Sequence, residues 1–82
     1  MTLSKYIAAA MDLAKYRTLS DGSFHGRIPG FRGVWSNEAT VESCRRVLQE
    51  VLEEWIVLKV AEHDPLPRIR GKSLHVPVSS HA

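Results

Sequence analysis

The sequence predicts a small α+β domain in which a three-stranded antiparallel sheet packs on one long helix. Residues 15–35 contain two turn signals between short segments with two-residue alternation, which is typical of strands joined as hairpins. Residues 41–62 then carry apolar side chains at every third or fourth position, which is typical of a helix. An additional helix over residues 4–14 and a short edge strand near the end of an extended segment, residues 65–78, complete this α/β architecture.

The length and composition are those of one domain. The chain has 82 residues, of which 44% are hydrophobic and 24% charged, so it is too short for two cores and too apolar for a disordered chain. We therefore expect a single domain over residues 1–82 with its core in residues 15–62. Domains of this size bury little apolar surface alone, so we also expect a homo-oligomer, either a dimer or a tetramer.

The first helix and the first hairpin have local sequence signals. Ser4 is the expected N-cap of the helix over residues 4–14. From Lys15 to Leu19 the pattern changes to the two-residue alternation of a strand. Asp21-Gly22 then predicts a tight primed turn, because such a turn needs positive φ, which glycine adopts freely and aspartate tolerates.

The second predicted strand has one apolar and one polar face. Phe24, Gly26 and Ile28 share one face, whereas His25 and Arg27 share the other. The first set is expected to face the core and the second to face water or a partner. Large side chains flank Gly26, and a gap of this kind usually admits a bulge or a neighbouring aromatic ring.

The turn from Pro29 to Gly33 leads into a third strand centred on Val34 and Trp35. Because neighbouring residues of a strand point to opposite faces, one of these two side chains must point away from the core. The sequence leaves open which one does; if Val34 faces the long helix, Trp35 faces a partner. An aromatic and arginine patch of the kind that protein-binding hot spots favour would then consist of Arg27, Phe31 and Trp35.

Thr40 is the expected N-cap of the long helix, and Glu42 lies in its first turn, where the helix dipole favours an anion. At the far end of this helix, apolar side chains cover nearly the whole circumference. A helix end with this pattern is normally buried on more than one side. We therefore expect the interface between subunits at four of its residues: Trp55, Ile56, Leu58 and Val60.

Residue chemistry gives no indication of an enzyme. A nuclease needs several carboxylates around a divalent metal ion, and the candidates lie in a helix, a turn, a linker and a helix cap: Asp12, Asp21, Glu38 and Glu42. Cys44 is a single cysteine within the apolar stripe of the long helix, which favours core packing over reactivity. No ligand spacing relates the four histidines: His25, His63, His75 and His81. We expect no catalytic residue, no metal and no cofactor.

The charge and hydropathy patterns restrict the partners. The net charge of +2 is too small to argue for a nucleic-acid partner, although it is distributed as +3, −4 and +3 over residues 1–37, 38–64 and 65–82. A solvated acidic helix between basic segments explains this distribution, and a charge-steered partner surface is the alternative. No segment approaches the roughly 20 apolar residues of a membrane span, and the first residues lack a secretory signal. We expect a cytoplasmic protein without a membrane partner.

The block from Phe24 to Trp35, together with the helix that starts at Thr40-x-Glu42, resembles the HicB-like antitoxin domain family. The matching positions are Pro29, Phe31, Gly33, Thr40, Glu42, Leu48, Leu52 and Trp55. They cover roughly half of the chain, and these turn and cap residues are individually common but jointly fairly specific.

This resemblance implies a β-β-β-α core, distantly like ribonuclease H in topology, that binds and blocks a HicA-like toxin, a small RNA-cleaving protein. Members of the family usually add a C-terminal DNA-binding domain. The segment from Pro65 to Ala82 is too short for a helix-turn-helix module, so we do not expect direct DNA binding. The alternative function is an orphan homo-oligomeric scaffold or regulatory adaptor with no toxin partner and no catalytic activity.

Overall fold

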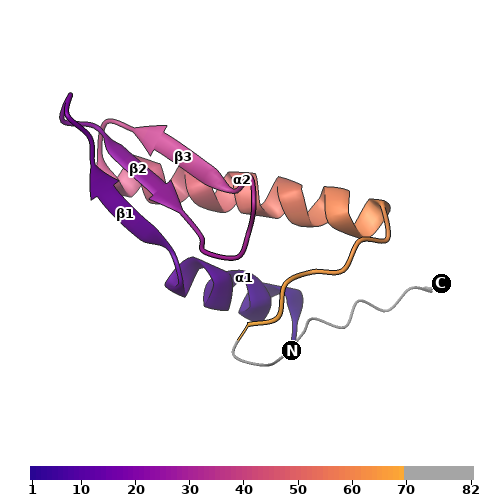
Figure 1. Ribbon diagram of the computed structural model, residues 1–82. Helices are drawn as coiled ribbons and strands as arrows, with labels where there is room; N and C mark the ends of the chain where they lie inside the picture. The colour runs from indigo at the N-terminus through magenta and orange to yellow at the C-terminus, as the bar shows by residue number, and fades with distance from the viewer. Residues whose placement is uncertain (70–82) are drawn as a thin grey trace.

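The computed structural model describes residues 1–69. This part of the chain contains, in order, α1 (Leu3–Asp12), β1 (Lys15–Thr18), β2 (Phe24–Arg27), β3 (Trp35–Glu38) and α2 (Val41–Ala61). The strands form a three-stranded antiparallel sheet in the order β1-β2-β3, and α2 packs on one face of it (Figure 1). The predicted α+β fold class is confirmed. The predicted C-terminal edge strand, residues 74–78, lies outside the described residues.

The N-terminal helix begins earlier than predicted because Thr2, not Ser4, is its N-cap. The Thr2 Oγ1 atom accepts a hydrogen bond from the backbone N–H of Lys5 at 3.2 Å, which satisfies one of the free donors at this helix end. Ser4 therefore lies inside the first turn. The helix buries three of its side chains: Tyr6, Ala10 and Met11.

The hairpin between β1 and β2 has a three-residue connection in place of the predicted two-residue primed turn. The Leu19 N–H donates to the carbonyl of Ser23 at 2.7 Å, so Ser20, Asp21 and Gly22 lie between the paired residues. Gly22 has a φ of +86°, whereas Asp21 does not adopt positive φ. The Asp21 carboxylate instead accepts hydrogen bonds from the hydroxyl and the amide of Ser23, which hold the pKa of Asp21 below its usual value.

Both ends of α2 are closed by local hydrogen bonds. Thr40 is the N-cap, as predicted, and its hydroxyl accepts a hydrogen bond from the amide of Ser43 at 3.0 Å. At the other end His63 adopts the left-handed conformation with a φ of 58°, and the amides of His63 and Asp64 donate back to the last turn. This is the Schellman arrangement, in which glycine is the usual left-handed residue. Neither helix within residues 1–69 combines the length and apolar character that a membrane crossing requires.

The sheet and α2 approach each other closely because the strands carry small residues at the contact. Gly26 of β2 is buried, and a Cβ atom there would lie 2.9 Å from the ring of Tyr16 and 3.0 Å from Cys44 Sγ. Ser36 is the partner of Gly26 in β3, and its hydroxyl donates to the Cys44 carbonyl at 2.8 Å. The predicted gap at Gly26 is therefore filled by the aromatic ring of the adjacent strand.

The long helix extends beyond the short strands. Its 21 residues span roughly 31 Å, whereas each four-residue strand spans roughly 13 Å. The second half of α2 is covered instead by α1 and by the segment that returns from α2 past α1, where Ile69 is buried (Figure 1). The resulting core comprises Tyr6, Ala10, Met11, Ile28, Phe31, Val34, Leu48, Leu52, Ile56 and Ile69.

Replacing Gly26 by alanine should destabilise the fold, because the new Cβ atom would overlap the Tyr16 ring and Cys44 Sγ. We expect the free energy of unfolding, measured by urea denaturation, to fall by about 1–3 kcal/mol, the usual cost of overpacking. Ser20→Ala in the exposed hairpin loop is the control and should change it by less than about 0.5 kcal/mol. Equal stability of Gly26→Ala and the wild-type protein would contradict this close packing.

Tyr6 should make folding stability depend on alkaline pH. Its side chain is fully buried, its hydroxyl donates to the carbonyl of Pro67, and burial raises its pKa from 10.0 to about 12. The unfolded chain therefore ionises first, so the contribution of Tyr6 is complete below pH 10 and is lost as the pH rises towards about 12.

The test is to compare the wild-type protein with Tyr6→Phe, which keeps the ring but cannot ionise. Tyr6→Phe should be less stable by about 0.5–1.5 kcal/mol at neutral pH, since the hydrogen bond to Pro67 is lost. This difference should shrink as the pH rises through the window from 10 to about 12. Parallel stability profiles of the two proteins in that window would show that Tyr6 is not protected from ionisation.

Candidate functional site

One face of the sheet is covered by α2, and within residues 1–69 no element covers the other (Figure 1). Tyr16, Gly26 and Ser36 point towards α2, so their strand neighbours point away from it. We call these outward-pointing residues the basic sheet face: Lys15, Arg17, His25, Arg27, Trp35 and Asn37. All are exposed except the half-buried His25.

The strand register arranges the basic sheet face in two rows. One row crosses the sheet through Lys15, Arg27 and Trp35. The other row crosses it through Arg17, His25 and Asn37. Residues that are directly opposite on neighbouring strands have Cβ atoms about 4.5–5.5 Å apart. The side chains of each row therefore form one continuous surface.

Trp35 is the largest exposed side chain of this face. It is 54% exposed, whereas Val34 is 2% exposed and lies in the core. The rings of Trp35 and His25 stack with their centroids 6.0 Å apart. His25 Nδ1 in turn lies 2.6 Å from the Asn37 side-chain oxygen, so Nδ1 donates to it and the imidazole is held in place. The indole of Trp35 thus stacks beside a hydrogen-bonded imidazole and lies opposite Arg27 in the strand register.

The charges of the basic sheet face all have one sign. It carries Lys15, Arg17 and Arg27 and no carboxylate, a formal charge of +3. The whole chain carries +2, so the remaining residues together carry −1. Three positive charges thus lie together on the sheet, whereas residues 38–64 carry −4 and residues 65–82 carry a further +3.

Phe31, which the sequence placed with Arg27 and Trp35, lies elsewhere. It is 4% exposed, and its ring contacts those of Tyr6 and Trp55 at centroid distances of 6.2 and 5.3 Å. It therefore contributes to the core where α1 and α2 meet and cannot touch a partner directly in this structure. Phe31 lies in a loop between Gly30 and Gly33, so no strand or helix periodicity in the sequence could indicate its burial.

A second exposed apolar surface lies on the second half of α2. We call it the helix-end patch, and it consists of Val57, Leu58 and Val60, which are 67%, 60% and 38% exposed. Leu58 and Val60 are two of the four residues expected in a subunit interface, and Val57 precedes Leu58 among the apolar residues of the same helix end. Of the other two expected residues, Ile56 is in the core at 4% exposed, and Trp55 is half-buried beneath the Lys59 ammonium, 5.2 Å from its ring centroid.

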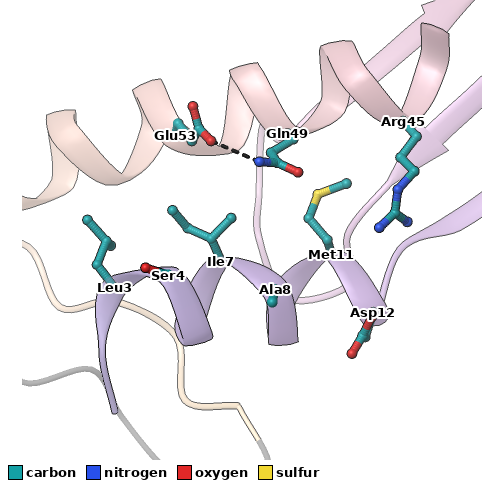
Figure 2. Close-up of a pocket in the computed structure, with 9 residues that line it drawn as sticks. All are labelled: Leu3, Ser4, Ile7, Ala8, Met11, Asp12, Arg45, Gln49 and Glu53. Atoms are coloured by element: carbon teal, nitrogen blue, oxygen red, sulfur yellow. Dashed lines mark hydrogen bonds between the residues drawn. The ribbon is translucent and has the colours of Figure 1, made fainter. Parts of the chain in front are cut away.

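A groove runs between α1 and α2, and Figure 2 shows the residues that line it. Leu3, Ile7 and Met11 of α1 point towards α2 and give the groove an apolar wall. Across from them, the Gln49 amide donates to the Glu53 carboxylate at 3.0 Å. The groove thus has ordinary helix-packing side chains and no pairing of a nucleophile with a base.

The carboxylates considered for metal binding do not form a site in the described part of the chain. Asp12 ends α1, Asp21 lies in the hairpin, and Glu38 and Glu42 flank the start of α2. Within residues 1–69 no group of three or more histidine, cysteine or carboxylate side chains could hold a metal ion. Cys44 is fully buried with its Sγ atom 3.2 Å from the Ser36 hydroxyl, which is a packing position.

A family model and a solved structure are similar to this chain over most of its length. The model of the UPF0150-like family matches residues 5–67. The fold is similar to the crystal structure of TTHA0281 from Thermus thermophilus, with a TM-score of 0.86 and 28% sequence identity, over 94% of this chain and 96% of that one. A comparison with curated proteins finds no match.

Proposed function

The chain belongs to the UPF0150-like family, and we propose that it is a cytoplasmic protein-binding module of the HicB antitoxin type. In this proposal it binds a HicA-like RNA-cleaving toxin directly and thereby neutralises it. The resemblance of the segment from Phe24 to Trp55 to HicB-like antitoxin domains supports the class of partner. The basic sheet face supports the place of binding.

The observation that carries this proposal is the exposed Trp35 beside Arg27. Tryptophan and arginine are the residue types most enriched among interface residues that dominate binding energy. Val34, which directly precedes β3, lies in the core at 2% exposed, so the fold itself does not require an aromatic ring at Trp35. An exposed tryptophan beside an arginine, which the core does not use, has the composition of a protein-binding hot spot.

The charges on the same face support the proposal independently. Lys15 lies directly opposite Arg27, and like charges in this position destabilise a sheet. A face selected for stability alone would pair these positions with carboxylates. Arrangements that reduce local stability are concentrated at functional sites. The pairing of Lys15 with Arg27 therefore favours a binding surface over a surface that is only solvated.

We propose that the activity is binding alone, without catalysis, and that it needs no cofactor. Of the four carboxylates considered, Asp21 has a local structural role, because the amide and the hydroxyl of Ser23 both donate hydrogen bonds to it. The test is incubation of the purified protein with single-stranded and structured RNA and DNA in the presence of Mg²⁺ or Mn²⁺. Cleavage that disappears on Asp21→Ala or Glu42→Ala would identify an enzyme instead.

Trp35→Ala should weaken binding to a HicA-like protein encoded beside this gene by about 2 kcal/mol or more, which is about a 30-fold rise in Kd. Arg27→Ala should have an effect of similar size. The melting temperature should change little in both variants, because Trp35 is 54% exposed and Arg27 is also exposed. Titration calorimetry on the copurified pair and circular dichroism of the variants measure the two effects separately.

Trp55→Ala is the matched control, since it removes the same side chain from a position that packs on Phe31. It should lower the melting temperature and leave the affinity of the folded protein unchanged. If Trp35→Ala unfolds the protein and Trp55→Ala weakens binding, the partner surface lies on α2 and not on the sheet. If no such toxin binds the wild-type protein, the proposed function is wrong.

We also propose that the protein associates with itself through the helix-end patch. Val57, Leu58 and Val60 are exposed apolar side chains close together in the sequence near the end of α2, beyond the sheet. Apolar side chains grouped in this way on a small domain are typical of subunit contacts. The same observation supports the alternative function, an orphan homo-oligomeric scaffold or regulatory adaptor without a toxin partner.

Leu58→Asp should convert a dimer or tetramer into a folded monomer of 9.2 kDa, because it places a charge in the contact but not in the core. Sedimentation velocity at micromolar concentration measures the change. Arg46→Asp, on an exposed position of the same helix, is the control and should leave the assembly intact. Ile56→Asp should unfold the chain instead, since Ile56 is 4% exposed. A wild-type monomer would contradict self-association.

A further inference from the structure

The half-buried His25 makes a hydrogen bond that the strand ladder does not require. It lies on the central strand β2, directly opposite Arg17 of β1 and Asn37 of β3. Its Nδ1 atom lies 2.6 Å from Asn37 Oδ1, so this bond joins two side chains across the sheet. Because the ladder already pairs β2 with β3, the main effect of the additional bond is to orient the His25 ring.

The His25 ring in turn contacts the indole of Trp35. The two residues are diagonal neighbours on β2 and β3, a spacing that aromatic side chains can bridge. Their rings stack with a centroid distance of 6.0 Å and an interplanar angle of 24°. Trp35 is 54% exposed, so it lacks the core contact that Trp55 makes with Phe31. Among the described residues, the imidazole is the aromatic ring that stacks with this indole.

A requirement of the fold does not explain this pair of side chains. Asn37 is exposed, and the pair lies on the face of the sheet that α2 does not cover. Of the two residues directly opposite His25, Asn37 alone can accept a hydrogen bond from Nδ1, because the Arg17 guanidinium has only donors. The side chains of β3 thus combine an exposed indole with the acceptor that orients the ring beside it.

The order of an exposed side chain affects how tightly it can bind. A side chain that becomes ordered only in the complex loses conformational entropy in the binding step, and this loss weakens the complex. A side chain that the free protein already holds in its binding orientation does not lose that entropy again. Contacts that restrict the Trp35 indole before binding therefore increase the affinity that this residue can supply.

We infer that His25 and Asn37 are positioning residues that act on partner binding through Trp35. Asn37 orients the imidazole by accepting the hydrogen bond from Nδ1, and the imidazole restricts the indole to its binding orientation. This inference rests on the proposed function, since it explains how the fold prepares the binding residue Trp35. Neither His25 nor Asn37 needs a contact of its own with the partner.

The first test measures the order of the indole without a partner. Nitrogen-15 relaxation gives an order parameter for the indole N–H of Trp35, and Trp55 is the internal reference. We expect about 0.85 for Trp35 in the wild-type protein and less than about 0.6 in Asn37→Ala and His25→Ala, with Trp55 unchanged. Asn37→Asp keeps an acceptor oxygen at the same place and should keep Trp35 ordered. Unchanged order of Trp35 in Asn37→Ala would overturn the inference.

The second test is a double-mutant cycle on binding to the purified HicA-like toxin, measured by titration calorimetry. Asn37→Ala should raise the Kd about threefold to tenfold, since the indole must then be ordered on binding. In a Trp35→Ala background the same substitution should change the Kd by less than about twofold, because the side chain through which Asn37 acts is gone. Circular dichroism of all variants should match the wild-type spectrum, since both side chains are exposed.

The other outcomes of the cycle separate the inference from the proposed function. An equal loss of affinity in both backgrounds would mean that Asn37 itself touches the partner, and the positioning role would be wrong. If Asn37→Ala binds like wild type while Trp35→Ala binds weakly, the inference is wrong and the proposed function stands. If the toxin binds Trp35→Ala as tightly as wild type, the inference and the proposed place of binding are both wrong. If the toxin does not bind wild type, the inference and the proposed function both fall.

Discussion

The close contact between α2 and the centre of the sheet is the constraint on which the rest of this structure depends. Each strand has only four residues, so the sheet offers little area and must be approached closely to form a core. The residues in contact there are Gly26, Ser36 and Cys44. The Ser36 hydroxyl donates a hydrogen bond to the Cys44 carbonyl, so this buried polar group is paired. Once α2 occupies this face, the opposite face of the sheet is left to solvent or to a partner.

The mismatch between a long helix and short strands explains the other elements. The part of α2 beyond the sheet needs its own cover, and α1 supplies it with Tyr6 as the central side chain. The hydrogen bond from Tyr6 to Pro67 ties the segment after α2 to the same cluster, in which Phe31 contacts both Tyr6 and Trp55. The face of α2 that α1 does not reach retains Val57 and Leu58 exposed. Because α1 packs on only one side of α2, apolar side chains on the other side of α2 stay exposed.

Much of this fold could be predicted from the sequence because its signals are local. The N-cap at Thr40 and the alternation of Val34 and Trp35 depend on residues within one turn or strand, and the structure agrees with both. Two predictions were wrong. Thr2 caps the first helix, although Ser4 is also a suitable N-cap residue. In the hairpin, the Asp21 side chain accepts a hydrogen bond from Ser23, and the Asp21 backbone does not adopt positive φ. The burial of Phe31 depends on packing between the two helices, for which the sequence has no pattern. The basic sheet face could be anticipated only in part, because the row containing Lys15 exists only once the strand register is known.

The two tryptophans show why burial, and not residue type, distinguishes scaffold from surface. Trp55 lies against Phe31 and beneath the Lys59 ammonium, so its indole serves the domain itself. Trp35 is more than half exposed, yet His25 and Asn37 hold its surroundings in order through a stacked ring and a hydrogen bond. Ordering exposed side chains costs conformational entropy that a solvated surface does not need to lose. The stacked ring and the hydrogen bond offset part of that loss within the protein itself, whereas the like charges of Lys15 and Arg27 stay opposite each other on the same exposed face.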